Sequence, residues 1–147
     1  MKKIITSLFI YKSQLYSSTL DGNITQQNIN TNYKNDGIEF NVNNHFEHTI
    51  VLDIKAYKDH LYILTRDGLY KYFDSRIDKI KNISDAQVIT IDQKLKILFI
   101  ISDSRGLIGL NLKNDNYIDD IEIELFNNGD SQVPITSITA HNGIIFL

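Results

Sequence analysis

The chain has 147 residues, 42% of them hydrophobic and 10% aromatic, so it is long enough to bury the core of one domain. Its net charge of −3 and the lack of a basic stripe argue against a nucleic-acid surface. Cysteine is absent, which excludes disulfides and thiolate chemistry and leaves the compartment undetermined. No segment reaches the roughly 18 apolar residues of a membrane helix. Lys12 interrupts the apolar run after Lys2 and Lys3, so that run does not predict a signal peptide.

Residues 4–22 and 50–68 are two copies of one segment, aligned without a gap at an offset of about 46 residues. The identical pairs are Tyr11/Tyr57, Lys12/Lys58, Leu15/Leu61, Tyr16/Tyr62, Thr19/Thr65, Asp21/Asp67 and Gly22/Gly68. In the second copy we expect a strand over Thr49–Tyr57, a polar turn over Lys58–His60 and a strand over Leu61–Thr65. Asp67-Gly68 predicts a tight hairpin in which glycine supplies a positive φ, followed by a third strand over Leu69–Phe73.

A fourth, more polar strand completes each copy, as expected for an outer strand that is half exposed to water. The three predicted fourth strands are Gly37–Val42, Ile77–Ile83 and Tyr117–Leu125. The stretches Gln26–Asp36 and Asn127–Val133 are rich in Asn, Asp and Gly and are predicted to be loops.

A third copy begins near Ala86 and has one extra residue in its Ser102–Gly106 turn. It aligns with the second copy through Ile54/Ile91, Leu61/Leu98, Tyr62/Phe99, Ile63/Ile100, Gly68/Gly106 and Leu69/Leu107. A fourth copy begins at 135–147, and an aromatic residue recurs at Tyr16, Tyr62, Phe99 and Phe146. The repeats therefore run approximately over 3–46, 47–85, 86–132 and 133–147, the last being incomplete. We interpret the chain as a fragment of a longer repeat array; the alternative is a last half-repeat completed by a partner chain.

Short strands repeated at this period are typical of β-propeller blades. The sequence predicts an all-β, β-propeller-like array of four-stranded antiparallel blades, about three and a half in this single partial domain of residues 1–147. The most buried residues should be Ile50, Leu52, Ile54, Leu61, Ile63, Ile89, Ile91, Leu98 and Ile100. Replacing Ile63 or Ile100 by Ala should cost about 2–5 kcal/mol.

The histidines, acidic residues and turn residues that could form a catalytic or metal site are better explained by their roles in the fold. His45, His48, His60 and His141 are expected to be solvated rather than metal ligands. Asp119, Asp120, Glu122 and Glu124 alternate with apolar residues, which predicts a charged outer strand; a calcium site is the alternative. The recurring Tyr and Phe residues are expected to pack between blades, and Asp67-Gly68 and Asp103–Gly106 to form turns. We therefore predict no catalytic, cofactor-binding or metal-binding residues and no cofactor.

The strand–turn–strand segments LYILTRDGLYKYF and LFIISDSRGLIGLNL resemble blade cores of the WD40-like and LVIVD-type β-propeller families. The resemblance covers about three copies. The Gly-His and Trp-Asp dipeptides of WD40 repeats are missing, so the resemblance does not extend to the Asp-His-Ser/Thr-Trp network of those blades. These families share a scaffold rather than an active site, and no family site residue is carried over.

A repeat without a site predicts a non-catalytic scaffold for protein–protein interaction, with protein partners and neither nucleic acid nor membrane. The loops 28–36 and 127–133 break the repeat register and are the expected partner contacts. The alternative is part of a propeller enzyme, or of an accessory subunit, with a site in the channel or in further blades. The open edge at Ile144, Ile145 and Phe146 also predicts self-association through blade edges.

Overall fold

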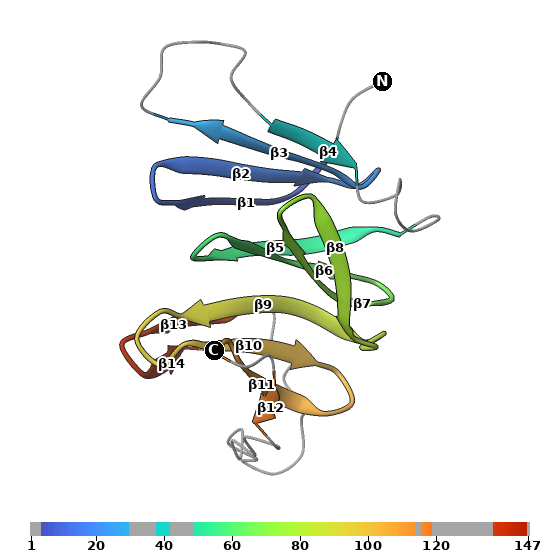
Figure 1. Cartoon of the computed structure of the whole chain (residues 1–147). Helices are drawn as coiled ribbons and strands as arrows, with labels where there is room; N and C mark the ends of the chain where they lie inside the picture. The colour runs from blue at the N-terminus through green and yellow to red at the C-terminus, as the bar shows by residue number, and fades with distance from the viewer. Residues whose placement is uncertain (1–3, 30–37, 42–48, 114–115, 119–136, 147) are drawn as a thin grey trace. The chain divides into compact units, whose positions relative to one another are not determined.

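The computed structural model describes residues 4–29, 38–41, 49–113, 116–118 and 137–146, and all of its regular elements there are β-strands (Figure 1). The predicted all-β class is therefore confirmed. No helix long and apolar enough to cross a membrane is found among these residues. The chain divides into two compact units, Met1–Ser84 and Asp85–Leu147, which are described separately.

The first unit contains two four-stranded antiparallel sheets in which each strand pairs with the next one along the chain. The first sheet comprises β1 (Ile5–Tyr11), β2 (Gln14–Thr19), β3 (Asn23–Asn28) and β4 (Ile38–Asn41). The second sheet comprises β5 (Val51–Tyr57), β6 (His60–Thr65), β7 (Gly68–Phe73) and β8 (Arg76–Lys81). The meander of each copy is thus the predicted one.

The second unit contains a third four-stranded sheet and a two-stranded hairpin. The third sheet comprises β9 (Ala86–Asp92), β10 (Ile97–Ser102), β11 (Gly106–Asn111) and β12 (Asn116–Ile118). β13 (Thr139–His141) and β14 (Ile144–Phe146) form the terminal hairpin, which corresponds to the predicted start of a fourth copy.

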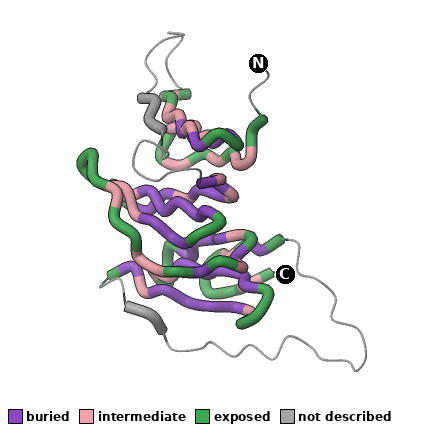
Figure 2. The backbone as a smooth tube through the Cα atoms, turned by 90° about the vertical axis from the view of Figure 1, so that its right-hand side faces the viewer, coloured by how far each residue is buried: buried purple, intermediate pink, exposed green. Residues whose placement is uncertain are grey.

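Each unit has its own apolar core between facing sheets. In the first unit, Tyr16 and Ile24 of the first sheet pack on Ile54, Leu61 and Ile63 of the second. The core of the second unit joins the third sheet to the terminal hairpin. Its buried members are Phe99, Ile101, Leu107 and Ile138. Buried residues predominate in β5, in β6 and in the first half of β7, where the tube of Figure 2 is mostly coloured as buried.

Most of the predicted core is confirmed: Ile54, Leu61, Ile63, Ile89, Ile91, Leu98 and Ile100 are buried. Ile50 and Leu52 are only half-buried, and this part of the prediction is wrong. The reason is a β-bulge in β5, where Val51 pairs with Thr65 and Asp53 with Leu64, leaving Leu52 as the extra residue. The bulge shifts the alternation of faces, so that Val51 becomes fully buried. β1 and β9 have an irregularity at the corresponding place.

The third copy is also out of the predicted register in its first strand. Ile63 pairs with Ile54, whereas the equivalent Ile100 pairs with Ile89, so the counterpart of Ile54 is Ile89 and not Ile91. The cause is the hairpin between these strands, which spans 58–59 in the second sheet but 93–96 in the third. An alignment based only on the spacing of apolar residues does not detect the longer hairpin loop.

The hairpin at Asp67-Gly68 forms, but its geometry differs from the predicted one. Arg66 and Asp67 form the two-residue loop, and Gly68 is already the first residue of β7, paired with Thr65. A Cβ on Gly68 would lie 2.2 Å from the carbonyl oxygen of Lys81, so glycine is required by the approach of β8. The predicted positive φ is present at Gly68 (153°), and Gly22 (82°) and Gly106 (71°) in the corresponding turns have it too; in the preceding hairpins Lys12, Ser13 and Lys58 also have positive φ.

Three further strand boundaries differ from the sequence prediction. Gln26, Gln27 and Asn28 were expected in a loop but belong to β3, because they pair with β2. His60 begins β6 instead of closing the turn. Of the predicted strand Tyr117–Leu125 only its first part falls within β12; 119–125, like the loop 127–133, lies outside the described residues.

Candidate functional site

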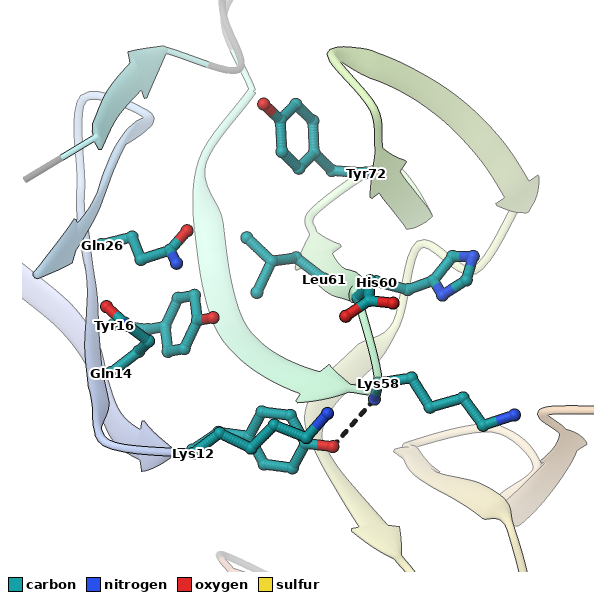
Figure 3. Close-up of a pocket in the computed structure, with 10 residues that line it drawn as sticks. Lys12, Gln14, Tyr16, Gln26, Lys58, His60, Leu61 and Tyr72 are labelled. Carbon is teal, nitrogen blue, oxygen red and sulfur yellow. Dashed lines mark hydrogen bonds between the residues drawn. The ribbon is translucent and has the colours of Figure 1, made fainter. Parts of the chain in front are cut away.

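A cleft of about 370 Å³ lies between the first and second sheets, at the end where the β1–β2 and β5–β6 hairpins turn (Figure 3). Its lining combines aromatic, amide and charged side chains from both sheets. The lining residues are Tyr11, Lys12, Gln14, Tyr16, Gln26, Lys58, Asp59, His60, Leu61 and Tyr72.

The strand register places the lining residues opposite one another. Tyr16 pairs with Gln26 across β2 and β3, and Leu61 pairs with Tyr72 across β6 and β7. Directly paired residues point to the same face of a sheet, so each pair forms a continuous wall. Tyr16 and Gln26 project from the first sheet toward Leu61, while the side chains of Lys58 and His60 point away from the cleft (Figure 3).

Tyr16 is a buried residue of the cleft wall formed by the first sheet. Its ring stacks on Phe9 with the centroids 4.8 Å apart and the planes inclined by 12°. Burial raises the pKa of Tyr16 above its ordinary value of 10.0, and the nearby Tyr11 and Asp59 raise it further. The phenol therefore stays neutral at physiological pH and can both donate and accept a hydrogen bond.

One hydrogen bond joins the two hairpins at the rim of the cleft, and two ring contacts lie within the individual sheets. The backbone N–H of Lys58 donates a hydrogen bond to the Tyr11 hydroxyl at 2.9 Å. The ammonium group of Lys12 lies 5.3 Å from the centroid of the Tyr11 ring, within cation–π range. His60 stacks on Phe73 at 4.5 Å. Aromatic faces, amides and ammonium groups are the chemistry of recognition, and Tyr in particular is enriched in protein interfaces.

A second polar cluster surrounds Asp67 in the second sheet. Its Oδ1 accepts hydrogen bonds from the hydroxyls of Thr49 at 2.7 Å and Thr65 at 2.5 Å. Its Oδ2 accepts from the Tyr70 hydroxyl at 2.6 Å and from Lys79 Nζ at 3.3 Å. Burial by itself would raise the pKa of Asp67, but these hydrogen bonds outweigh it and hold that pKa well below its ordinary value.

The Asp67 cluster has the properties of a structural network. A carboxylate whose two oxygens are both occupied by donors is a poor base and a poor ligand. Burial and the hydrogen bond to Asp67 raise the pKa of Tyr70, so this phenol stays protonated as well. The first sheet repeats part of the arrangement, because Asp21 accepts a hydrogen bond from Thr19 at 2.5 Å. The sequence interpretation of these residues as turn residues is consistent with these bonds.

In the third sheet a different aspartate takes this role. Ser102, the counterpart of Thr65, donates to Oδ2 of Asp85 at 2.8 Å, and the backbone N–H of Ser104 donates to the same oxygen at 2.8 Å. The hydrogen bond from the Ser104 hydroxyl is the largest influence that lowers the pKa of Asp85, which falls to about 2.

No catalytic or metal-binding residue was predicted from the sequence, and neither the cleft nor the Asp67 network was foreseen. Thr-x-Asp at Thr19–Asp21 and Thr65–Asp67 was the available signal for the network. For the cleft no such signal existed, because its two walls come from different copies. His60 lies on the cleft and His141 ends β13. His45, His48 and the acidic residues Asp119, Asp120, Glu122 and Glu124 lie outside the described residues.

Comparison with known proteins defines the fold class. No protein-family model matches the chain, and no curated protein matches it in sequence. Among solved structures, the chain is similar to the WD40 repeats of RRP9 (TM-score 0.63, 15% identity, 81% of this chain and 38% of that one). It is also similar to the WD40 domain of Neurospora crassa Pan2 (TM-score 0.63, 6% identity, 94% and 41%). The computationally designed Ika4 protein matches with a TM-score of 0.57 and 13% identity over 83% of this chain and 74% of that one.

These similarities identify the architecture as that of a β-propeller, built from consecutive four-stranded blades, as the sequence predicted. The chain spans about two fifths of the length of the two WD40 domains. The geometry and the comparisons agree on the fold of part of a propeller. The sheets are called blades from here on.

Proposed function

We propose that the chain is a non-catalytic scaffold for protein–protein interaction and that a peptide segment of a partner binds in the cleft between the first two blades. The observation that carries this proposal is the cleft itself, with Tyr16 and Gln26 facing Leu61 and Tyr72 across it. A propeller scaffold displays binding groups at the ends of rigid strands, and here Tyr16 is held by ring stacking.

The chemistry of the cleft suits an extended peptide. The amides of Gln14 and Gln26 can each donate and accept hydrogen bonds, as a peptide backbone requires. Tyr72 and Leu61 offer apolar surface for a side chain of the partner. Lys12 on the rim favours an acidic residue nearby, although Asp59 offsets part of its charge.

The loop predicted as a partner contact begins beside this cleft. β3 ends at Asn28, which pairs with Gln14, and the N–H of Ile29 donates to the carbonyl of Ser13 at 3.0 Å. Residues 30–36 of that loop are outside the described residues. Their starting point at the cleft supports including them in the proposed partner surface.

Selection from a random peptide library displayed on phage tests the proposal. Peptides enriched on the full chain should bind Tyr72→Ala and Gln26→Ala at least about tenfold more weakly, which corresponds to a loss of about 1.4 kcal/mol at a contact residue. Asp78→Ala, on β8 and outside the cleft lining, is the matched control and should bind normally. Failure to enrich any peptide, or enriched peptides equally sensitive to Asp78→Ala, would contradict the assignment of the cleft.

A further inference from the structure

Three polar side chains of the cleft between the first two blades have hydrogen-bonding capacity that the chain itself does not use. Tyr16 is only 7% exposed, and its side chain projects toward Leu61 on the opposite wall (Figure 3). Within the part of the chain that the structure describes, its hydroxyl forms no hydrogen bond, and neither do the side-chain amides of Gln14 and Gln26. A buried hydroxyl without a partner is costly. These groups therefore favour a ligand that brings hydrogen-bond acceptors into the cleft.

The two facing walls of the cleft are sheet faces without an open strand edge. The side chains that face each other across it come from β2 and β3 on one side and from β6 and β7 on the other. Each of these four strands is paired on both sides. A peptide in the cleft therefore cannot join them as an additional strand through backbone hydrogen bonds, and side chains have to recognise it.

The lining also does not suit an α-helical segment. The backbone N–H and C=O groups of a helix are bonded within the helix, so a helix would cover Tyr16, Gln14 and Gln26 without giving them a backbone acceptor. A helix that docks in a groove uses a row of apolar contacts along several turns. Leu61 is the only aliphatic side chain among the described lining residues.

The charged groups around the cleft do not form a site for a phosphorylated segment. Phosphate groups are typically recognised by clustered arginines, which bind them through two parallel hydrogen bonds. The described lining contains no arginine. The side chain of Lys58 points away from the cleft (Figure 3), and Asp59 offsets part of the charge of Lys12. The ligand that fits is therefore largely uncharged where it lies between the walls.

We propose that the partner segment contains proline and binds in the polyproline II conformation, an inference that rests on the proposed function of the cleft as a peptide site. A polyproline II segment has no internal hydrogen bonds, so its carbonyl groups can accept from the Tyr16 hydroxyl and from the amides of Gln14 and Gln26. Proline has no N–H, so the segment adds acceptors without adding donors that need partners. Its rings pack on aromatic faces, which Tyr11 and Tyr72 supply.

Two phage libraries that differ only at two fixed positions test this inference on the full chain. One displays X-Pro-X-X-Pro-X and the other X-Ala-X-X-Ala-X, where X is any amino acid. Selection should recover at least about tenfold more phage from the proline library, because proline fixes the bound conformation in advance.

Three variants locate the contact of the recovered peptides. Tyr16→Phe keeps the ring that stacks on Phe9 and removes only the hydroxyl, so it should weaken binding about three- to tenfold. Gln26→Glu replaces an amide donor by an acceptor and should weaken binding at least about tenfold. Tyr62→Phe makes the same change as Tyr16→Phe at the equivalent residue of the second blade, outside the cleft lining, and should bind normally.

The possible results separate this inference from the proposed function. Peptides that depend on Gln26 but come equally from both libraries would overturn the polyproline II assignment and leave the cleft as a peptide site. Proline peptides that bind Tyr16→Phe, Gln26→Glu and Tyr62→Phe equally well, with all three variants folded by circular dichroism, would overturn it too. Recovery from neither library would contradict the proposed function as well as this inference.

Discussion

The first and second blades contain the same segment in two different surroundings. Their first two strands begin and end at equivalent residues, their first hairpins turn at Lys12 and Lys58 with positive φ, and each first strand has a register shift at the same place. The two blades differ on one face: Leu8 of the first blade is exposed, whereas its counterpart Ile54 in the second is fully buried. The comparison shows that the repeated residues specify the blade, while the presence of a neighbouring sheet decides which side chains become core.

The residues on the face that carries Leu8, and on the equivalent face that carries Ile54, follow this difference. Ile63 and Tyr70 of the second blade, both buried, correspond to Ser17 and Thr25 of the first. The hydroxyls of Ser17 and Thr25 form a hydrogen bond with each other, so they can stay partly exposed without lowering the stability of the blade. Apolar volume is therefore concentrated where a neighbouring blade is present to bury it.

The largest test of the comparison is truncation at the two equivalent positions. Ile54→Ala should lower the free energy of unfolding by about 2–5 kcal/mol, because it leaves a cavity in the core of the first unit. Leu8→Ala should change it by less than about 0.5 kcal/mol, because the side chain is already in water. Urea denaturation measures both. Equal losses would contradict the exposure of Leu8 in the first blade.

The aspartates at the equivalent turns provide the second test. Asp67→Ala should cost about 1.5–3 kcal/mol, because it removes the charged acceptor of Thr49, Thr65 and the buried Tyr70 hydroxyl. Asp21→Ala should cost about 0.5–1.5 kcal/mol, since Thr25 stands in the first blade where the second has Tyr70, and its hydroxyl bonds to Ser17. Thermal unfolding monitored by circular dichroism ranks the two variants, and a larger loss at Asp21 would reverse the interpretation.

Acid should weaken the same network. The pKa of Asp67 in the folded protein lies below its value in the unfolded chain, so its contribution to stability is complete above about pH 4. That contribution is lost as the pH falls through the folded pKa. Asp67→Asn should therefore lose less stability between pH 5 and pH 2 than the unsubstituted protein. Part of the pH dependence should remain in the variant, because the pKa of Asp85 is lowered as well. An unchanged pH profile would show that Asp67 does not stay ionised by these bonds.

The smallest expected effect is at the contact between the first hairpins. Tyr11→Phe removes the acceptor of the Lys58 N–H and should cost about 0.5–1.5 kcal/mol. Hydrogen exchange followed by NMR should show faster exchange of the Lys58 amide, with no change at Ile100 in the other unit. Unchanged exchange at Lys58 would mean that another group takes over the bond.

Strands, copies and most of the core were readable in the sequence because alternation and turn residues act locally. Tyr16/Tyr62, Asp21/Asp67 and Gly22/Gly68 alone indicate repeated hairpins. The counterpart of Ile54 was misassigned because hairpin length depends on backbone geometry that apolar spacing does not record. The Asp67 network was only half visible, since the Thr-x-Asp motif predicts neither Thr49 nor Tyr70 as partners.

The sequence by itself thus determined the all-β class, the blade-like repeat and most of the side chains that form the core, because these follow from residue periodicity and turn chemistry. Tertiary structure alone decided that Val51 replaces Leu52 in the core, that Gly68 makes room for the Lys81 carbonyl, and that Tyr16 and Leu61 face each other across a cleft. Each of these depends on the distance between segments that are far apart in the chain, and that distance is set only when the sheets pack.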